Sequence, residues 1–316
     1  MRFATLQPEE CGKVSRGLAG LTAMLLALLL GACATRLFPA DPAHAALTRV
    51  MTFNIRLDTA SDDANAWPYR RTMVIDLIRH EAPDVLGMQE VLVGQKRALE
   101  EALPEYAVLG VGRDDGREGG EFSPVAFRRD RFELLESGTF WLSATPQTPA
   151  AGWDAALPRV ATWAILRDRR AGETIRVLNT HFDHVGQLAR ANSARQIVRW
   201  VENGPGAGLP TIVMGDFNAA PGSEPYRILN NPNASSLVDS GVVSRSPRYG
   251  PQGTFTGFNI THDASEPIDH IFVTSELTVD SHQVITQHWG GRLPSDHYPV
   301  QAVLRLRGDG EPVRSR

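Results

Sequence analysis

The 316-residue sequence predicts an α/β fold in which two mixed β-sheets pack face to face and helices flank them, a four-layered sandwich. Strand-like and helix-like segments alternate along most of the chain, which is typical of α/β proteins. Several strand-like segments are short continuous apolar runs, so they are expected to be buried on both faces. Two packed sheets with helices outside would bury all of these runs.

Periodicity and turn residues assign the individual elements. In the first expected helix the apolar residues recur at helical spacing, and Pro83 follows its end. Helices are expected at residues 68–80, 95–103 and 187–201. Strands are expected at residues 50–53, 84–88, 106–111, 123–128, 161–167, 174–180, 211–215, 268–273 and 298–306.

The first 32 residues differ from the rest and read as a targeting segment. Residues 18–32 form an apolar run broken only by Thr22 and preceded by Lys13 and Arg16. A membrane-spanning helix needs about 20 apolar residues, so this shorter run favours a signal peptide. Its end, Leu30-Gly31-Ala32-Cys33, resembles the bacterial lipobox, in which the cysteine is lipidated. A short membrane anchor or an uncleaved signal remains an alternative.

The expected organisation follows from this assignment. Residues 1–32 are a lipoprotein signal peptide, 33–48 a tether, 49–307 the catalytic domain and 308–316 a disordered tail. Lipid on Cys33 would place the protein in the bacterial cell envelope, on the periplasmic or outer-membrane face. The other cysteine, Cys11, would leave with the signal, so the mature chain has no thiol for a disulfide or a thiolate metal site. We expect a monomer.

The charge balance argues against a general nucleic-acid binder. The formal net charge is −4, with hydrophobic content of 42% and charged content of 22%. Loss of residues 1–32 removes three of 32 basic and two of 36 acidic side chains, which leaves 29 and 34 and a net charge of −5. Non-specific nucleic-acid binders usually carry a basic excess because they neutralise phosphates. A local basic rim would not show in this count.

Polar residues lie repeatedly at the C-terminal ends of the apolar strands. A strand that buries its body and presents a carboxylate, amide or imidazole at its tip is how α/β enzymes build their sites. The six tips are Asn54; Gln89-Glu90; Asn179-Thr180-His181-Phe182-Asp183; Gly215-Asp216-Phe217-Asn218; Ile268-Asp269-His270; and Ser295-Asp296-His297.

In this order, the six motifs resemble those of the endonuclease/exonuclease/phosphatase family, which includes pancreatic deoxyribonuclease, sphingomyelinases and nocturnin-like phosphatases. The resemblance covers residues 49–307. It implies a hydrolase of phosphodiesters or phosphomonoesters that depends on Mg²⁺ or Mn²⁺. Loop segments such as Phe-Trp-Leu-Ser and Arg-Val-Ala-Thr-Trp are similar to those of bacterial members close to the deadenylase and nocturnin group.

The resemblance implies a metal site of hard oxygen ligands. Glu90 is then the main ligand, Asn54 lies beside it, and Asp296 matches a ligand of the metal or of the attacking water. Carboxylate and amide oxygens are what Mg²⁺ and Mn²⁺ prefer. Taken alone, Glu90 is more readily interpreted as a surface residue at a strand end.

The resemblance also assigns the catalytic groups. Asp216 is the general base, and Asn218, two residues on, holds a phosphoryl oxygen. Without the other motifs, this pair reads as an Asx-turn that caps backbone groups. His297 pairs with Asp269, which orients the ring and supports its positive form.

Two further residues complete the expected site. His181 occupies the second histidine position and is expected to contact the phosphoryl group, while Glu121 matches a glutamate that orients this histidine. A histidine considered by itself is more often structural. His270 is assigned no role.

The substrate is less defined by the sequence. Loops at residues 65–71, 140–159 and 253–258 hold aromatic residues and arginines that could bind a base, a sugar or a phosphate. Trp163 is expected in the core, whereas Trp67 and Trp153 could be core or binding residues. Phospholipid head groups, sugar or inositol phosphates and nucleic acid are the candidate substrates, and the acidic charge favours the smaller esters. The alternatives are an extracellular nuclease, a zinc hydrolase and a non-catalytic binding lipoprotein of the same fold.

Overall fold

The computed structural model describes residues 47–231, 236–262 and 266–307. The predicted signal peptide, the lipidation site at Cys33, the tether up to residue 46 and the tail at 308–316 lie outside the described residues. Among the residues that are described, no helix has the length and apolar character needed to cross a membrane.

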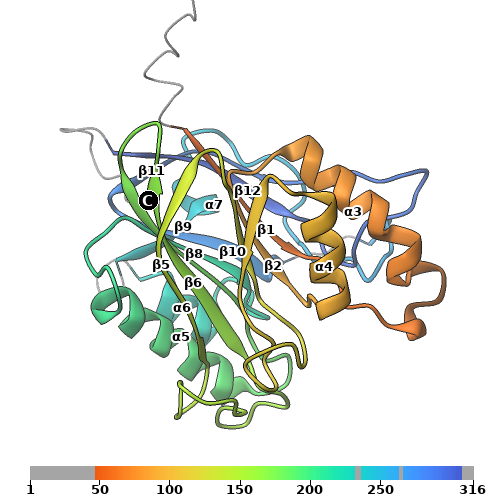
Figure 1. Ribbon diagram of the computed structural model, residues 1–316, viewed down its shortest axis with the longest axis horizontal. Helices are drawn as coiled ribbons and strands as arrows, with labels where there is room; N and C mark the ends of the chain where they lie inside the picture. The colour runs from red at the N-terminus through yellow and green to blue at the C-terminus, as the bar shows by residue number, and fades with distance from the viewer. Residues whose placement is uncertain (1–46, 232–235, 263–265, 308–316) are drawn as a thin grey trace, which may run out of the picture. The chain divides into compact units, whose positions relative to one another are not determined.

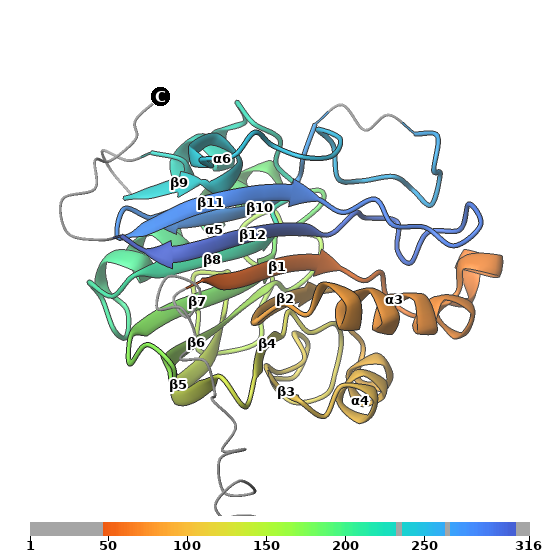
Figure 2. The ribbon, with the colours of Figure 1, turned by 90° about the horizontal axis from the view of Figure 1, so that it is seen from above.

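Two mixed six-stranded sheets form the centre of the fold, as the sequence predicted (Figures 1 and 2). The first sheet contains, in spatial order, β11 (Leu277–Val284), β12 (Val300–Leu306), β1 (Thr48–Asn54), β2 (Val85–Gln89), β4 (Val125–Arg128) and β3 (Tyr106–Leu109). The second contains β5 (Phe132–Trp141), β6 (Val160–Asp168), β7 (Thr174–His181), β8 (Thr211–Asp216), β10 (Asp269–Thr274) and β9 (Leu237–Asp239).

Helices complete the outer layers. The 3₁₀ helix η1 (Ala60–Asn65) precedes α3 (Trp67–Glu81), and α3 and α4 (Val93–Ala102) pack on the first sheet (Figure 2). On the second sheet lie α5 (Gln187–Asn203) and α6 (Glu224–Leu229). The short α7 (Ser240–Val243) contacts β10 and β11.

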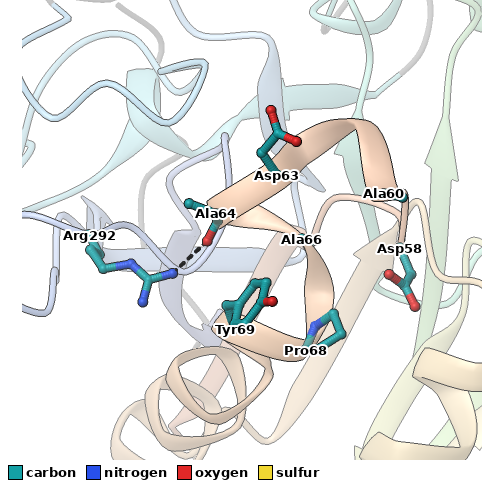
Figure 3. Close-up of a pocket in the computed structure, with 8 residues that line it drawn as sticks. All are labelled: Asp58, Ala60, Asp63, Ala64, Ala66, Pro68, Tyr69 and Arg292. Atoms are coloured by element: carbon teal, nitrogen blue, oxygen red, sulfur yellow. Dashed lines mark hydrogen bonds between the residues drawn. The ribbon is translucent and has the colours of Figure 1, made fainter.

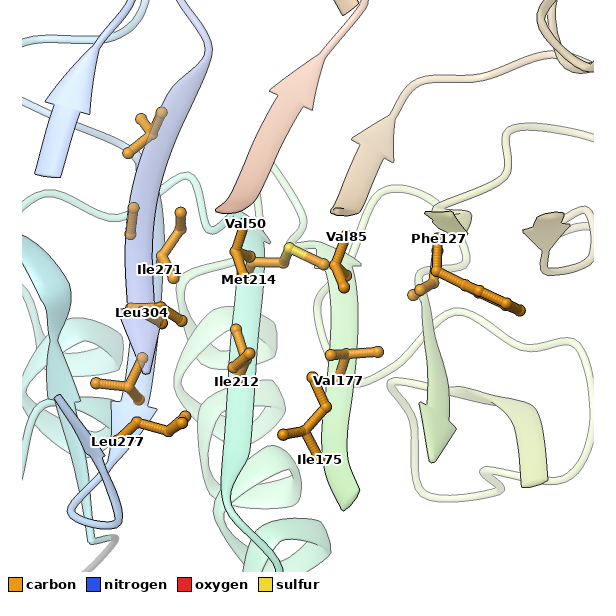
Figure 4. Close-up of a cluster of buried hydrophobic side chains, with 14 of the residues drawn as sticks. Val50, Val85, Phe127, Ile175, Val177, Ile212, Met214, Ile271, Leu277 and Leu304 are labelled. Carbon is orange, nitrogen blue, oxygen red and sulfur yellow. The ribbon is translucent and has the colours of Figure 1, made fainter. Parts of the chain in front are cut away.

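A continuous apolar core fills the space between the sheets. Val50 and Val85 of the first sheet face Ile212, Met214 and Val177 of the second, and each of them is at most 1% exposed (Figure 4). Each such side chain contributes roughly 1.5–3 kcal/mol when fully buried. Because this layer holds the sheets in a fixed register, residues at the strand ends are held at fixed separations.

Two long strands were missed by the sequence reading. β5 occupies residues that were assigned in part to a loop at 140–159, so Phe140 and Trp141 belong to a strand and the loop begins after them. Most of β5 is partly or fully exposed because it is an edge strand, so it has no apolar run. β11 was missed because Thr278, Asp280 and Ser281 interrupt its pattern, and a bulge shifts its register.

The strand register brings the polar tips to one edge. In the first sheet, parallel β1 and β2 end together with Asn54 opposite Gln89. In the second sheet, parallel β7 and β8 end with His181 opposite Asp216. Antiparallel β10 begins with Asp269 opposite Asp216. The ends of parallel strands, and the start of an antiparallel neighbour, necessarily meet at the same edge.

A buried amide joins the two sheets just below this edge. Asn179 of β7 donates from Nδ2 to the carbonyl oxygens of Met88, at 2.7 Å, and Pro124, at 2.9 Å. Its Oδ1 accepts from Gln89 Nε2 at 2.6 Å. Gly87 leaves room for this side chain, since a Cβ there would lie 2.5 Å from Asn179 Oδ1.

We therefore expect Gly87→Ala to lower the free energy of unfolding by about 2–4 kcal/mol, because the added methyl displaces a buried amide from its partners. Urea denaturation measures the change. Gly94→Ala is the matched control, since a Cβ at Gly94 on α4 meets nothing within 4 Å. Equal stability of the two variants would contradict this account of the amide.

A second polar cluster lies buried on the face of β10 opposite to Asp269, because successive side chains of a strand point to opposite faces. His282 Nδ1 lies 2.9 Å from Ser240 Oγ, and His270 Nδ1 lies 3.0 Å from Asp239 Oδ2. Tyr226 donates its hydroxyl to the same Asp239 oxygen at 3.1 Å. Burial lowers the pKa of His282 to about 4, although the charge of Asp239 opposes the shift. His270 is thus a buried structural histidine, paired with Asp239.

This cluster predicts a specific dependence of stability on pH. His282 stays neutral in the folded chain, while its unfolded pKa is near 6.5, so the unfolded state binds the extra proton between about pH 6.5 and 4. The free energy of unfolding should therefore fall across this window as the pH falls, by about 3 kcal/mol for this group. His282→Asn, which cannot titrate, should show a flatter profile in urea denaturation. Identical slopes for both proteins would refute the assignment.

Candidate active site

Asn54 is the central side chain at the strand-end edge, and it is fully buried. Its Nδ2 donates to Glu90 Oε1 at 3.0 Å and to Asp216 Oδ2 at 2.9 Å, and it lies 3.5 Å from His297 Nε2. Its Oδ1 accepts from the backbone N–H of Arg56 at 3.0 Å. One amide thus links carboxylates that belong to different sheets.

Glu90 and Asp296 form an acidic pair on one side of this amide. Glu90 has a φ of 60°, a strained conformation for a non-glycine residue that turns its carboxylate into the site. Arg56 approaches both groups, with Nη1 3.6 Å from Glu90 Oε2 and Nε 3.8 Å from Asp296 Oδ2. Burial raises the pKa of Asp296, and the nearby charge of Glu90 adds to the effect. The pair therefore concentrates negative charge that a cation would relieve.

His297 and Asp269 form a buried dyad. His297 donates from Nδ1 to Asp269 Oδ2 at 2.8 Å, and its Nε2 faces Asp216 Oδ2 at 3.7 Å. Burial opposes the charged ring, but the charges of Asp269 and Asp216 hold the pKa of His297 well above its usual value. The ring is therefore an imidazolium whose Nε2–H points into the site.

Asp216 lies at the meeting point of these groups. Burial and the charge of Asp269 raise its pKa to about 7, which His297 and the N–H of Asn218 oppose. The backbone N–H of Asn218 donates to Asp216 Oδ1 at 3.0 Å, so the Asx-turn expected as an alternative is present. The turn does not exclude a catalytic role, because the second oxygen, Oδ2, faces Asn54, His181 and His297. A carboxylate with a pKa near neutrality is suited to general base catalysis.

His181 and Asn218 form the opposite side of the site. His181 Nε2 lies 3.2 Å from Asn218 Nδ2 and 3.5 Å from Asp216 Oδ2. Burial, helped by the positive charges of Arg159 and His297, holds the pKa of His181 well below its usual value. Asn218 has a φ of 45°, a conformation that asparagine adopts more readily than most residues. This side of the site therefore offers neutral hydrogen-bonding groups.

Glu121 lies near His181 but is committed to another partner. Arg113 binds both of its carboxylate oxygens, at 2.8 and 2.7 Å. The distance from Glu121 Oε2 to His181 Nδ1 is 3.8 Å, too long for a hydrogen bond. The role of Glu121 in orienting His181 stays a prediction.

The donor atoms of the site decide which metal ion it suits. Asp216, Asp269 and His297 are close enough to share an ion, but Asp269 is occupied by a histidine that carries positive charge. Glu90 and Asp296 offer carboxylate oxygens only, which suits Mg²⁺ or Mn²⁺ better. The donors at Glu90 and Asp296 therefore fit such an ion. Asn54 presents its amide nitrogen to Glu90 here, so its role as an oxygen ligand stays a prediction.

Several residues that the sequence reading missed hold the site in place. Arg70 is fully buried and donates to backbone carbonyls of Ile55, Arg56 and Leu57, which fixes the chain that follows Asn54. It was grouped with a substrate-binding loop, and this was wrong because its guanidinium is used up within the fold. Arg56 was also missed. Its place two residues after Asn54 is the sequence feature that could have indicated that it lies beside the site.

The three tryptophans considered in the sequence differ in burial, and the loop at 253–258 lies against His297. Trp67 and Trp163 are 5% and 8% exposed and belong to the core, whereas Trp153 is 40% exposed. Phe255, in the loop at 253–258, packs edge-on against His297 with ring centroids 5.1 Å apart. This loop therefore contributes directly to the wall around His297.

Comparison with known proteins places this arrangement in a class of phosphate-ester hydrolases. The model of the endonuclease/exonuclease/phosphatase family matches residues 51–297, and the chain belongs to this family. The four-layered fold and the hydrolase class expected from the sequence are therefore confirmed.

Solved bacterial structures are similar over most of the chain. A family protein of Bacteroides vulgatus is 38% identical with a TM-score of 0.78, covering 83% of this chain and 99% of that one. A mannosyl-6-phosphatase of Bacteroides thetaiotaomicron is 35% identical with a TM-score of 0.77, covering 82% and 100%. Nocturnin of Mus musculus is 26% identical over 79% of this chain, and the match spans 62% of nocturnin. The chain thus spans less than two thirds of that curated relative.

The two buried Asp–His pairs allow a controlled test of the dyad. Asp269→Asn should lower the pKa of His297, because a neutral amide no longer stabilises the imidazolium, and it should reduce kcat by at least about 10³-fold. NMR titration of the ring and turnover of bis-p-nitrophenyl phosphate measure the two effects. Asp239→Asn breaks the similar pair with His270 outside the site, so it should lower stability and leave turnover within about twofold. A His297 pKa that stays as high in Asp269→Asn as in the wild type would contradict the dyad.

Proposed function

We propose that this protein is a hydrolase of phosphate esters that uses Mg²⁺ or Mn²⁺ and acts outside the cytoplasm, anchored by lipid on Cys33. The observation that carries the catalytic part is the convergence of Glu90, Asp216 and His297 on the amide of Asn54. The export part rests on the signal-like run at 18–32 and the lipobox-like segment that ends at Cys33.

The proposed chemistry assigns each side of the site a task. Asp216 takes a proton from the attacking water, a role generally worth about 10²- to 10⁴-fold. Asn218 and the neutral His181 hold the phosphoryl oxygens, while the cationic His297 stabilises the charge that develops on them. A divalent ion held by Glu90 and Asp296 would supply further positive charge to the phosphoryl oxygens.

The proposed substrates are small phosphate esters, with sugar phosphates foremost. Two observations support them: the acidic net charge of −4, and 35% identity over 82% of the chain to a structure described as a mannosyl-6-phosphatase. The rival is a nuclease, which is favoured by similarity to a CCR4-Not complex 3'-5'-exoribonuclease subunit of Emericella nidulans, 20% identical over 82% of this chain.

Metal rescue and mutation test the proposal together. After chelation, Mg²⁺ or Mn²⁺ should restore hydrolysis and Zn²⁺ should not, because the donors at Glu90 and Asp296 are hard oxygens. Asp216→Asn and His297→Ala should each remove nearly all activity and leave the circular dichroism spectrum unchanged. The assay panel is mannose 6-phosphate, inositol phosphates, sphingomyelin, bis-p-nitrophenyl phosphate, RNA and plasmid DNA.

The outcomes of this panel separate the candidates. Preferred turnover of RNA or DNA would support the nuclease, and Zn²⁺-specific rescue would support a zinc hydrolase. Normal turnover by Asp216→Asn or by His297→Ala would overturn the assigned roles. No turnover of any ester with either metal would leave a binding protein of this fold.

A further inference from the structure

A groove of about 740 Å³ opens on the surface formed by η1 and the first turn of α3 (Figure 3). The polar and aromatic side chains that line it are Asp58, Asp63, Tyr69 and Arg292, and Pro68 lies beside the tyrosine. The volume lies in the range of pockets that enclose a small molecule. We name it the η1 groove.

Two chain segments that rim the groove lead directly into the catalytic site. Asp58 follows Leu57, whose backbone N–H donates to Glu90 Oε2 at 3.2 Å. Arg56 binds Asp62 of η1 at 2.9 Å and also approaches Glu90. On the other rim, Arg292 lies four residues before Asp296. The η1 groove is therefore tied to the side of the site where the metal-ligand candidates lie.

The walls of the groove are held rigid. Arg292 donates to the carbonyl oxygen of Ala64 at 2.7 Å, the bond drawn in Figure 3. Buried Arg70 holds the carbonyl oxygen of Asn65 at 2.8 Å. Asp63 has φ 48° and ψ −115°, a strained conformation of the kind that accumulates at ligand sites. A preformed wall lowers the entropy cost of binding.

The chemistry of the lining selects among ligand classes. Tyr69 is 64% exposed, which leaves its aromatic face open. Within the described part of the chain, the carboxylates of Asp58 and Asp63 make no hydrogen bond or ion pair, and the guanidinium of Arg292 donates only to the carbonyl oxygen of Ala64. Two free carboxylates repel a polyphosphate backbone, whereas each accepts hydrogen bonds from hydroxyl groups. An open aromatic face, two acceptors and a donor suit a neutral, polyhydroxylated ring.

We infer that the η1 groove binds the saccharide portion of a phosphorylated sugar while its phosphate occupies the catalytic site. This deepens the proposed function and rests on it for the phosphate end. The phosphate is held by Asn218, His181 and His297, as in the proposed function, and the groove recognises the sugar hydroxyls remote from phosphorus.

Kinetics of Tyr69→Ala and of Asp58→Ala, which removes a hydrogen-bond acceptor, test the groove in the full-length protein. The substrates are mannose 6-phosphate, a 6-phosphorylated mannose disaccharide and p-nitrophenyl phosphate. Each variant should raise KM for the disaccharide ester about five- to tenfold, the size of one lost aromatic contact or hydrogen bond, with kcat and p-nitrophenyl phosphate turnover unchanged. Tyr249→Ala is the control, because Tyr249 is also exposed, at 74%, and lies outside the groove.

Saturation-transfer NMR with unphosphorylated mannobiose tests the groove without catalysis. The wild type should show transfer that Tyr69→Ala abolishes and Tyr249→Ala retains. No transfer to the wild type, transfer to a dinucleotide instead, or an unchanged KM in both groove variants would each overturn the saccharide site. Mannobiose binding through Tyr69 without hydrolysis of any ester would keep the groove and reject the proposed function.

Discussion

The concentration of buried carboxylates at one strand-end edge is the constraint on which this structure depends. Asp216, Asp269 and Asp296 are each at most 6% exposed, and Glu90 is 9% exposed. Buried like charges are unfavourable unless they are paired and hydrogen-bonded. The protein offsets this with one imidazolium, one bridging amide and one guanidinium, from His297, Asn54 and Arg56. The remaining excess of negative charge explains why a divalent cation would suit the site.

The groups that surround them also give the two histidines of the site different pKa values. His297 and His181 are both buried within contact of Asp216, yet their pKa values move in opposite directions. His297 has Asp269 behind it, whereas His181 has arginines nearby and, among the described residues, no hydrogen-bonded carboxylate. One site therefore holds a cationic and a neutral histidine at the same pH, which phosphoryl chemistry can use for two different purposes.

The second buried Asp–His pair shows that geometry alone does not identify a catalytic dyad. The pair of Asp239 and His270 has a separation of 3.0 Å, close to the 2.8 Å of Asp269 and His297. It faces Tyr226 and the carbonyl of Ala219 instead of other titratable groups of a site. The pair of Asp269 and His297 differs in its neighbours: Asp216, Asn54 and His181 lie around it and come from strands of both sheets.

The sequence by itself determined the fold class and indicated the polar residues that form the candidate site. Buried strands must be apolar, and the polar residues that follow them are visible as strand tips, so Glu90, Asp216 and His297 could be found without coordinates. Edge strand β5 carries little buried surface and therefore left no pattern.

Only the tertiary structure decided which groups touch. In the folded chain Glu121 is bound by Arg113, and the amide nitrogen of Asn54 faces the carboxylates of Glu90 and Asp216. The guanidinium of Arg70 holds the backbone that follows Asn54. The tertiary structure also gathered Asp58, Tyr69 and Arg292 around one groove although the last is over 200 residues away in sequence. Such contacts depend on side-chain direction and on packing between distant segments, and neither is encoded in the local periodicity from which a sequence is read.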